Sequence, residues 1–260
     1  MQQTAPIVTS LGKAELHRIT VRGLDLCQDI VGKISFADMT YLMLAGRLPS
    51  AQQARVVDAL LTVLVEHGMV GNIVAARLIY HSAPEAIQAA VATALLAAGS
   101  VHLGSSEYAA RALVEALPPD NPEADLDAVA AQILAEHAAG RKRIAGIGHR
   151  THAEGDPRAD RLFEVAREMG VYGRYCDLIH RVSAAAEARG GRRLPVNVTG
   201  AIAAISLDLG LPWQMAKAFA LIGRTLGAVA HIGEEIRNPM ALNIDAAIKG
   251  ALRYEPDGKG

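Results

Sequence analysis

A glycine-flanked histidine and a nearby arginine are the residues of this chain whose types and spacing best suit chemistry. Residues 146–150 read Gly-Ile-Gly-His-Arg, and Asp-Pro-Arg follows at residues 156–158. Glycines let the backbone approach a ligand closely, and the imidazole of His149 titrates near neutral pH. The guanidinium of Arg158 suits a carboxylate. The pattern predicts a site that binds and polarises a carboxylate-bearing substrate, with a surface turn and an incidental histidine as the alternative.

The composition narrows the classes of protein to which the chain can belong. With 260 residues, 51% of them hydrophobic, it can bury a core in one or two domains. A formal net charge of −1 indicates no nucleic-acid or membrane-surface partner. The two cysteines form no disulfide framework, and no metal-ligand spacing occurs, so we expect a reducing cytoplasm and no metal. Neither a signal peptide nor a long apolar run is evident, which predicts no membrane span.

The elements that position these residues are predicted to be helices, and the fold to be all-α. Alanine and leucine are abundant, aromatic residues make up only 4%, and apolar positions recur at helical spacing. A capping box of Ser50 and Gln53 predicts a helix over residues 50–67 that ends before Gly68. Ser82 and Glu85 repeat the pattern, which predicts a second helix that runs to Gly99.

A third helix is predicted to begin after Leu211-Pro212 and to run from Trp213 to about Arg237, because proline is tolerated at the start of a helix. This helix carries Arg224 and His231 on one face. For His231 the sequence leaves two roles open, support of a site and ordinary packing. The proline-rich residues 117–122 are predicted to form a loop that separates two helical blocks.

Several motifs, taken in order, carry a resemblance to a known family. They are residues 20–26 with 46–49, residues 99–104, residues 146–150 with 156–158, and residues 223–227 through His231. Together they resemble the citrate synthase superfamily, and most of all its short citryl-CoA lyase branch. The branch rests on the short segment from Pro49 to His67, where full citrate synthases carry a long helical insertion. Residues 66–68 and 194–200 are also similar to the lyase module that ends ATP-citrate lyase.

The resemblance implies a large helical domain of residues 1–104 and 196–260, with a smaller mobile helical domain of residues 105–195. It also implies retro-aldol cleavage of citryl-CoA, or a related 3-hydroxyacyl-CoA, to acetyl-CoA and oxaloacetate or a related 2-oxo acid. Coenzyme A would enter as part of the substrate, and no tightly bound cofactor is expected. A homodimer is expected by the same resemblance.

The resemblance assigns catalytic roles to three positions. His102 would donate a hydrogen bond to the thioester oxygen as the enolate forms. His149 would act as general base at the hydroxyl that becomes a ketone. Thr199 stands where the family has an aspartate directly after Asn-Val, and this is the main departure from the family pattern. A threonine hydroxyl cannot replace a carboxylate base at neutral pH.

The resemblance also assigns binding roles. His67 would hydrogen-bond the oxaloacetate half, Arg158 and Arg224 would clamp carboxylates, and Arg237, a weaker candidate, would reach a neighbouring subunit. The basic residues 141–143 would meet the phosphates of coenzyme A, unless they are a solvated helix end. The coenzyme A contacts implied are Arg143, Ala145, Gly146, Ile147 and Gly148.

Thr199 leaves several functions open. One alternative is that Glu107 or Asp156 takes over the role of the aspartate. The others are that the substrate needs no such proton transfer, or that the protein has lost the family reaction. The chain is accordingly a lyase, a citrate synthase-type condensing enzyme, or a catalytically weakened paralogue that binds acyl-CoA. A different 3-hydroxyacyl-CoA, or a 1,3-dicarbonyl thioester cleaved with water, is a further substrate class.

Overall fold

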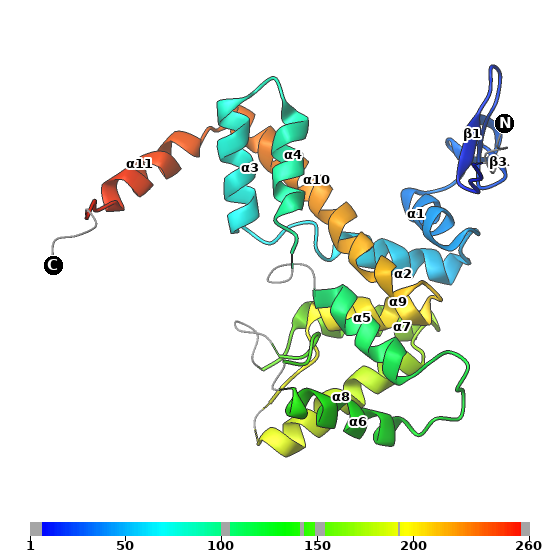
Figure 1. Cartoon of the computed structure of the whole chain (residues 1–260). Coiled ribbons are helices and arrows are strands. Elements are labelled where there is room, and N and C mark those ends of the chain that lie inside the picture. Colours follow the sequence, from blue (N-terminus) through cyan, green and yellow to red (C-terminus); the bar gives the residue numbers. More distant parts are fainter. Residues whose placement is uncertain (1–6, 100–104, 141–142, 149–153, 192, 256–260) are drawn as a thin grey trace, which may run out of the picture. The chain divides into compact units, whose positions relative to one another are not determined.

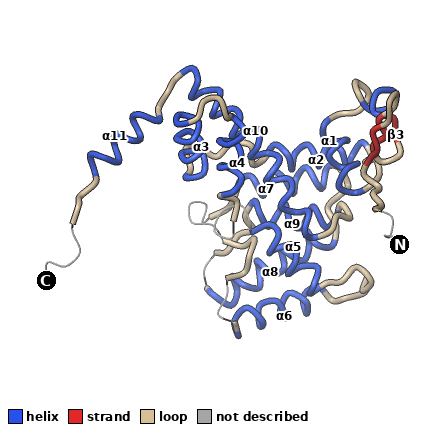
Figure 2. Tube along the Cα trace, turned by 45° about the horizontal axis from the view of Figure 1, so that its top comes forward, coloured by secondary structure: helices blue, strands red, loops and turns tan. Residues whose placement is uncertain are grey.

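The computed structural model describes residues 7–99, 105–140, 143–148, 154–191 and 193–255. Helices dominate these residues, so the prediction of an all-α fold is confirmed (Figure 2). No helix within the described ranges is long and apolar enough to cross a membrane. The chain forms two compact units, Met1–Val63 with Ser105–Phe219, and Leu64–Gly104 with Ala220–Gly260. The boundaries of these units differ from those of the predicted large and small domains. Because the predicted domains are defined by a closing motion, that division stays a prediction.

The first unit begins with a small antiparallel sheet, which is a departure from the predicted all-helical pattern. Its strands β1, β2 and β3 pair in that order, and the turn between β2 and β3 contains Arg22 and Gly23, both at positive φ. Helices make up the rest of the unit (Figure 1). The elements are β1 (Gly12–Ala14), β2 (Ile19–Val21), β3 (Leu24–Asp25), the π-helical turn η1 (Leu26–Ile30), α1 (Phe36–Ala45), α2 (Ala51–Thr62), α5 (Ser105–Ala116), α6 (Leu126–Ala139), α7 (Pro157–Glu168), α8 (Arg174–Gly190), α9 (Val198–Asp208) and the 3-10 turn η2 (Trp213–Met215).

Helix α9 is the centre of the first unit. Nine of its eleven residues are buried, and α5, α7 and α8 pack against it. Small residues such as Gly200 and Ala201 allow this close approach of helices from several sides. The N-terminal end of α9, which follows the Asn-Val motif, therefore has a fixed position within the unit.

The second unit is a smaller helical group. It contains α3 (Gly71–Ser82), α4 (Ile87–Leu96), most of α10 (Ala216–Arg237) and α11 (Ala241–Ala251). Helices α3 and α4 lie side by side as a hairpin in both overall views (Figures 1 and 2). Its core joins α3, α4 and α10 through the buried residues Ile73, Ala76, Ala94 and Ala228.

The sequence predicted some helix ends and missed others. The capping box is present, since Ser50 Oγ accepts from the Gln53 amide at 3.1 Å, but α2 ends at Thr62 rather than before Gly68. The predicted helix start at Ser82 is wrong. Ser82 is the last residue of α3, where its hydroxyl donates to the Leu78 carbonyl at 3.0 Å, and α4 begins later, at Ile87. The loop over residues 117–122 is confirmed, because α5 and α6 end and begin on either side of it.

Candidate active site

The two histidines predicted to be catalytic, His102 and His149, lie outside the described residues. The structure does describe the residues that precede His149 and the helix that begins shortly after His102. Three described segments lie next to these histidines in the sequence or bond to those that do. They are the turn over residues 146–148, the start of α9 and the start of α5.

The turn before His149 is pinned to the segment that enters α9. The Gly148 amide donates to the Pro195 carbonyl at 2.7 Å, and the Asn197 amide donates to the Gly146 carbonyl at 3.0 Å. The side chain of Asn197 adds a third bond, in which Nδ2 donates to the Gly148 carbonyl at 2.8 Å. Three hydrogen bonds across three residues hold a turn firmly. The backbone that carries His149 thus begins from a defined point beside the N-terminal end of α9.

Two glycines make this contact possible. Gly146 adopts φ +84°, and a Cβ atom there would lie 2.7 Å from Gly200 Cα. A Cβ atom on Gly200 would lie 2.3 Å from the Gly146 carbonyl oxygen. Any side chain at either position would force the turn away from α9. The buried Gly146 therefore has a packing role, and the proposed coenzyme A contacts of Ala145, Gly146, Ile147 and Gly148 stay a prediction.

Thr199 belongs to a neutral hydrogen-bond chain. Asn197 caps α9, and its Oδ1 accepts from the backbone amides of Thr199 at 3.1 Å and Gly200 at 3.2 Å. The Thr199 hydroxyl donates to the same Oδ1 at 2.6 Å and accepts from Ser105 Oγ at 2.9 Å. The hydroxyl hydrogen of Thr199 is thereby committed to Asn197. The position where the family has a carboxylate holds a chain of hydroxyl and amide groups from α5 to α9.

Asp156 connects α7, α9 and Arg158. It is fully buried, and it accepts from Arg158 Nε and Nη2, both at 2.9 Å, and from the Val198 amide at 2.9 Å. Burial alone would raise the pKa of Asp156, but the hydrogen bonds from Arg158 and Val198 hold it below the ordinary aspartate value. Asp156 is a structural carboxylate with both oxygens in use. It is therefore a poor replacement for the missing aspartate.

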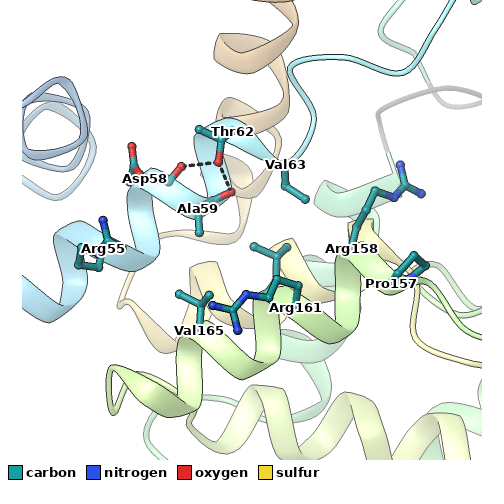
Figure 3. Close-up of a pocket in the computed structure, with 10 residues that line it drawn as sticks. Arg55, Asp58, Ala59, Thr62, Val63, Pro157, Arg158, Arg161 and Val165 are labelled. Atoms are coloured by element: carbon teal, nitrogen blue, oxygen red, sulfur yellow. Dashed lines mark hydrogen bonds between the residues drawn. The ribbon is translucent and has the colours of Figure 1, made fainter.

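Arg158 also lines a pocket of about 550 Å³ between α2 and α7, which the sequence analysis did not predict (Figure 3). The side chains of Arg158 and Arg161 leave α7 in different directions there. Arg161 reaches Glu164 at 2.9 Å and Glu168 at 3.0 Å, which neutralises much of its charge. The lining residues are Arg55, Asp58, Ala59, Thr62, Val63, Pro157, Arg158, Arg161, Leu162 and Val165.

In the second unit, the fully buried Arg77 lies among carboxylates. Its Nη1 donates to Glu235 Oε2 at 2.9 Å, and its Nη2 contacts Glu234 and His231 Nδ1, the latter at 2.8 Å. Glu235 also accepts from the amides of Met240 and Ala241, both at 2.9 Å. Burial would raise the pKa of Glu235, but the bonds from Ala241, Arg77 and Met240 lower it. Buried ions are stable only when paired in this way.

The predicted binding residues of the second unit differ in exposure. His67 is exposed in the segment between α2 and α3, and Arg237 is exposed at the end of α10. Arg224 lies in the same helix and is only 4% exposed. Arg143 belongs to the first unit and is exposed. The structure thus gathers Arg158, Thr199 and the turn before His149 in one unit, while His67, Arg224 and Arg237 belong to the other.

Ser105 and Arg77 are two residues of these networks that were not predicted from the sequence. Ser105 bonds to Thr199 across 94 positions of sequence, which no local pattern reveals. Arg77 did carry a signal, since it shares the buried side of α3 with Ile73 and Ala76. A charged residue on an apolar helix face predicts a buried partner of opposite charge. Glu234 and Glu235 are consecutive acids near the end of a largely apolar helix, so they were candidates for that partner.

Comparisons with known proteins place the chain in a family. The family model for the C-terminal domain of citrate synthase matches residues 35–243. Citrate/2-methylcitrate synthase of Bacillus subtilis (strain 168) is 26% identical over an alignment of 215 residues, and the match covers 79% of this chain and 54% of that protein. Citrate synthase of Deinococcus radiodurans is 25% identical over 233 residues, 86% of this chain and 59% of that protein. The chain spans about half the length of the curated relatives it matches.

Solved structures also match over nearly all of this chain. The structure of citryl-CoA lyase from Hydrogenobacter thermophilus has a TM-score of 0.87 at 32% identity, and the match covers 98% of this chain and 96% of that one. ATP citrate lyase from Methanothrix soehngenii, in complex with citrate and coenzyme A, has a TM-score of 0.77 at 17% identity, over 100% of this chain and 43% of that one. The second likeness concerns the fold alone. Since the family model covers well over half of the chain, the chain belongs to the citrate synthase family.

Proposed function

We propose that the chain is a carbon-carbon lyase that cleaves citryl-CoA, or a related 3-hydroxyacyl-CoA, to acetyl-CoA and oxaloacetate or a related 2-oxo acid. The observation that carries the proposal is the likeness to a citryl-CoA lyase over almost the full length of both chains. The matches to the synthase relatives, by contrast, cover only about half of those proteins. Coenzyme A enters as part of the substrate, and no tightly bound cofactor is needed for the reaction.

The reaction is a retro-aldol cleavage. A base removes the proton of the substrate hydroxyl, the adjacent carbon-carbon bond breaks, and its electron pair passes into the thioester enolate. His149 serves as that base, and His102 donates a hydrogen bond to the enolate oxygen. The hydrogen-bonded turn over residues 146–148 supports this assignment, because a catalytic side chain must be held in a defined position relative to the substrate.

Arg158 binds a substrate carboxylate. Asp156 holds its guanidinium through Nε and Nη2, so the donors of Nη1 remain for a substrate oxygen. A guanidinium that is already oriented loses little entropy when it binds, which suits a clamp. Arg224 and His67 bind the remaining carboxylate and the oxaloacetate half, and Arg237 reaches a neighbouring subunit.

Thr199 removes the carboxylate that would exchange the proton of the acetyl carbon. Protonation of the enolate in cleavage and deprotonation of acetyl-CoA in condensation are the same step in two directions, and the Ser105–Thr199–Asn197 chain offers only neutral groups for it. In the cleavage direction the released enolate is strongly basic and takes its proton from water. A catalytically weakened paralogue that binds acyl-CoA without turnover is the second candidate, and Thr199 is the observation that favours it.

A homodimer in the cytoplasm fits the surface and the cysteines. Helices α10 and α11 expose several large apolar side chains, a property that is typical of protein interfaces. Cys27 and Cys176 are not joined in a disulfide, as is usual in a reducing compartment. The exposed apolar residues are Leu226, Val229, Ile236, Leu242 and Ile248.

The test is turnover of citryl-CoA by the purified wild-type protein and by His149→Ala. We expect oxaloacetate and acetyl-CoA from the wild type and a loss of about 10²–10⁴-fold in the variant. Binding of coenzyme A without turnover in the wild type would favour the weakened paralogue instead. A wild type and a variant with equal turnover would contradict the role of His149.

A further inference from the structure

A continuous chain of ionisable side chains in the second unit leads to the segment that carries His67. It begins at the buried Arg77 in α3, passes through His231 in α10, and ends at Glu66. The His231 ring is 12% exposed, and its two nitrogens lie 2.8 Å from Arg77 Nη2 and 2.8 Å from Glu66 Oε2. Both distances are those of hydrogen bonds.

The neighbours of His231 determine its tautomer. A guanidinium only donates, so Nδ1 of His231 must accept from Arg77 and carries no hydrogen. The hydrogen of the neutral ring is therefore on Nε2, where it donates to Glu66. Each group in the chain has one defined role as a donor or an acceptor.

Glu66 joins this chain to the backbone around His67. One carboxylate oxygen accepts from His231 Nε2, and the other accepts from the Gly68 amide, two residues further along the chain. Gly68 adopts φ +76°, which bends the backbone sharply just after His67. Partial burial would raise the pKa of Glu66, but the bonds from Gly68 and His231 lower it, so the carboxylate stays charged.

Arg77 is a rigid anchor for the chain. It is fully buried and is paired with both Glu234 and Glu235, one turn after His231 in the same helix. Helix α10 also meets the segment before Glu66 without a gap, because a Cβ atom on Gly227 would lie 2.0 Å from the Val65 carbonyl oxygen. The turn over residues 66–68 is therefore held against α10 at two points.

We propose that Glu66, His231 and Arg77 are positioning residues, which hold the backbone turn that carries His67 so that its imidazole meets the substrate carboxylate. The proposal rests on the proposed function of His67 in substrate binding. It adds three residues that do not touch the substrate themselves.

The chain makes an unusual prediction for Glu66→Gln. The groups that bond to Glu66, namely the His231 ring and the backbone amides of His67 and Gly68, are all donors, and a glutamine side chain has only one acceptor atom. Its amide hydrogens would point at one of these donors, so glutamine should disrupt the turn although it has the same shape. His231→Gln, by contrast, can accept from Arg77 and donate to Glu66, and should preserve the turn. His231→Ala removes both bonds.

The experiment measures steady-state kinetics with citryl-CoA and amide hydrogen exchange at Gly68 in the full chain. For Glu66→Gln and His231→Ala we expect KM to rise about tenfold, with kcat changed less than about twofold. Exchange at Gly68 should become about tenfold faster in both variants, and His231→Gln should stay within about twofold of the wild type in each measurement. Glu85→Gln, at an exposed carboxylate of the same unit, is the matched control and should change neither value.

Two results separate this proposal from the proposed function. Unchanged Gly68 exchange in Glu66→Gln would overturn the positioning role, whatever the substrate is. Faster exchange in a protein that does not cleave citryl-CoA would support the turn's dependence on Glu66 and would overturn the lyase function instead. An equal rise of KM in Glu66→Gln and in the Glu85→Gln control would also contradict the proposal.

Discussion

Thr199 is the single residue with the largest consequence for the chemistry. Its hydroxyl donates to Asn197 and accepts from Ser105, so it is held in place but carries no charge. Removal of a proton from a thioester methyl group requires a base, such as a carboxylate, whose pKa suits the working pH. This position offers a neutral hydroxyl in place of a carboxylate, so proton exchange at the acetyl carbon should be slow in both directions of the proposed reaction.

Thr199→Asp should therefore introduce hydrogen exchange at the acetyl carbon. We expect the rate at which acetyl-CoA takes up deuterium from D2O to rise by about 10²-fold or more, because a positioned base commonly supplies 10²–10⁴-fold. Mass spectrometry of acetyl-CoA measures the uptake. Thr199→Ser, which keeps the hydroxyl chain to Asn197, is the control. Rapid exchange in the wild type already would contradict this account of Thr199.

Asp156→Asn should cost stability and substrate affinity together. Loss of one member of a buried ion pair commonly costs about 3–5 kcal/mol, because the remaining charge is left without a partner. The free energy of unfolding in urea should fall by that order, and KM should rise as Arg158 loses its orientation. Unchanged urea stability would show that Asp156 is not the anchor that its contacts indicate.

The same residue should contribute to acid sensitivity. Because the pKa of Asp156 is lowered in the folded protein, its stabilisation is present above the ordinary aspartate value of about 3.9. It should be lost as the pH falls from there through the lower folded-state pKa. Urea unfolding at several pH values should show a smaller loss of stability on acidification in Asp156→Asn than in the wild type. Parallel curves would contradict the assignment.

At the scale of elements, the start of α9 organises the candidate site. It receives the turn before His149, the side chain of Asp156 and the hydroxyl of Ser105, each through hydrogen bonds. Helix α9 is buried on nearly all sides, so these three elements share one rigid reference. The close contact of Gly200 with Gly146 is what lets the turn lie so near the helix.

Gly200→Ala should test this contact. A Cβ atom 2.3 Å from a backbone oxygen forces the two segments apart, and overpacking of this kind costs about 1–3 kcal/mol. We expect a lower midpoint in urea and a large loss of activity. Gly190→Ala, at the end of α8, is the matched control, since its added Cβ atom meets nothing within 4 Å. Equal stabilities of the two variants would mean that the close contact is not required.

Elements with strong local signals were predictable from the sequence, and elements defined by distant partners were not. The capping box at Ser50 and the loop over residues 117–122 depend on neighbouring residues, and both were predicted. Ser82 carries the same local pattern as Ser50 but ends a helix, because α3 before it uses the serine for its own last turn. The N-terminal sheet has strands of two or three residues, too short for a periodic signal.

The candidate site shows the same division. The positions of Thr199 and Arg158 within motifs were readable in the sequence, and so was the glycine pattern before His149. The partners of these residues were not, because Ser105 reaches Thr199 across 94 positions and Asn197 reaches Gly148 across 49. Arg77 is an intermediate case. Its charge on an apolar helix face predicts a buried partner of opposite charge but does not identify that partner.

At the scale of the whole molecule, the match to a citryl-CoA lyase covers 96% of that chain, whereas the match to a synthase covers 54% of that protein. The proposed homodimer would bury the exposed apolar residues of α10 and α11. Sedimentation equilibrium should therefore give twice the mass of the 260-residue chain. Leu226→Glu should raise the dissociation constant at least about tenfold, since it places a charge on this apolar face. A monomeric wild type would contradict the proposed homodimer.

The most direct test of the account is a product count. Citryl-CoA is incubated with the protein, and acetyl-CoA, oxaloacetate, citrate and free coenzyme A are measured against the citryl-CoA consumed. Retro-aldol cleavage predicts one acetyl-CoA and one oxaloacetate for each citryl-CoA that disappears. Citrate and free coenzyme A as the products would show thioester hydrolysis and would contradict the proposed lyase, and no consumption would exclude citryl-CoA as its substrate.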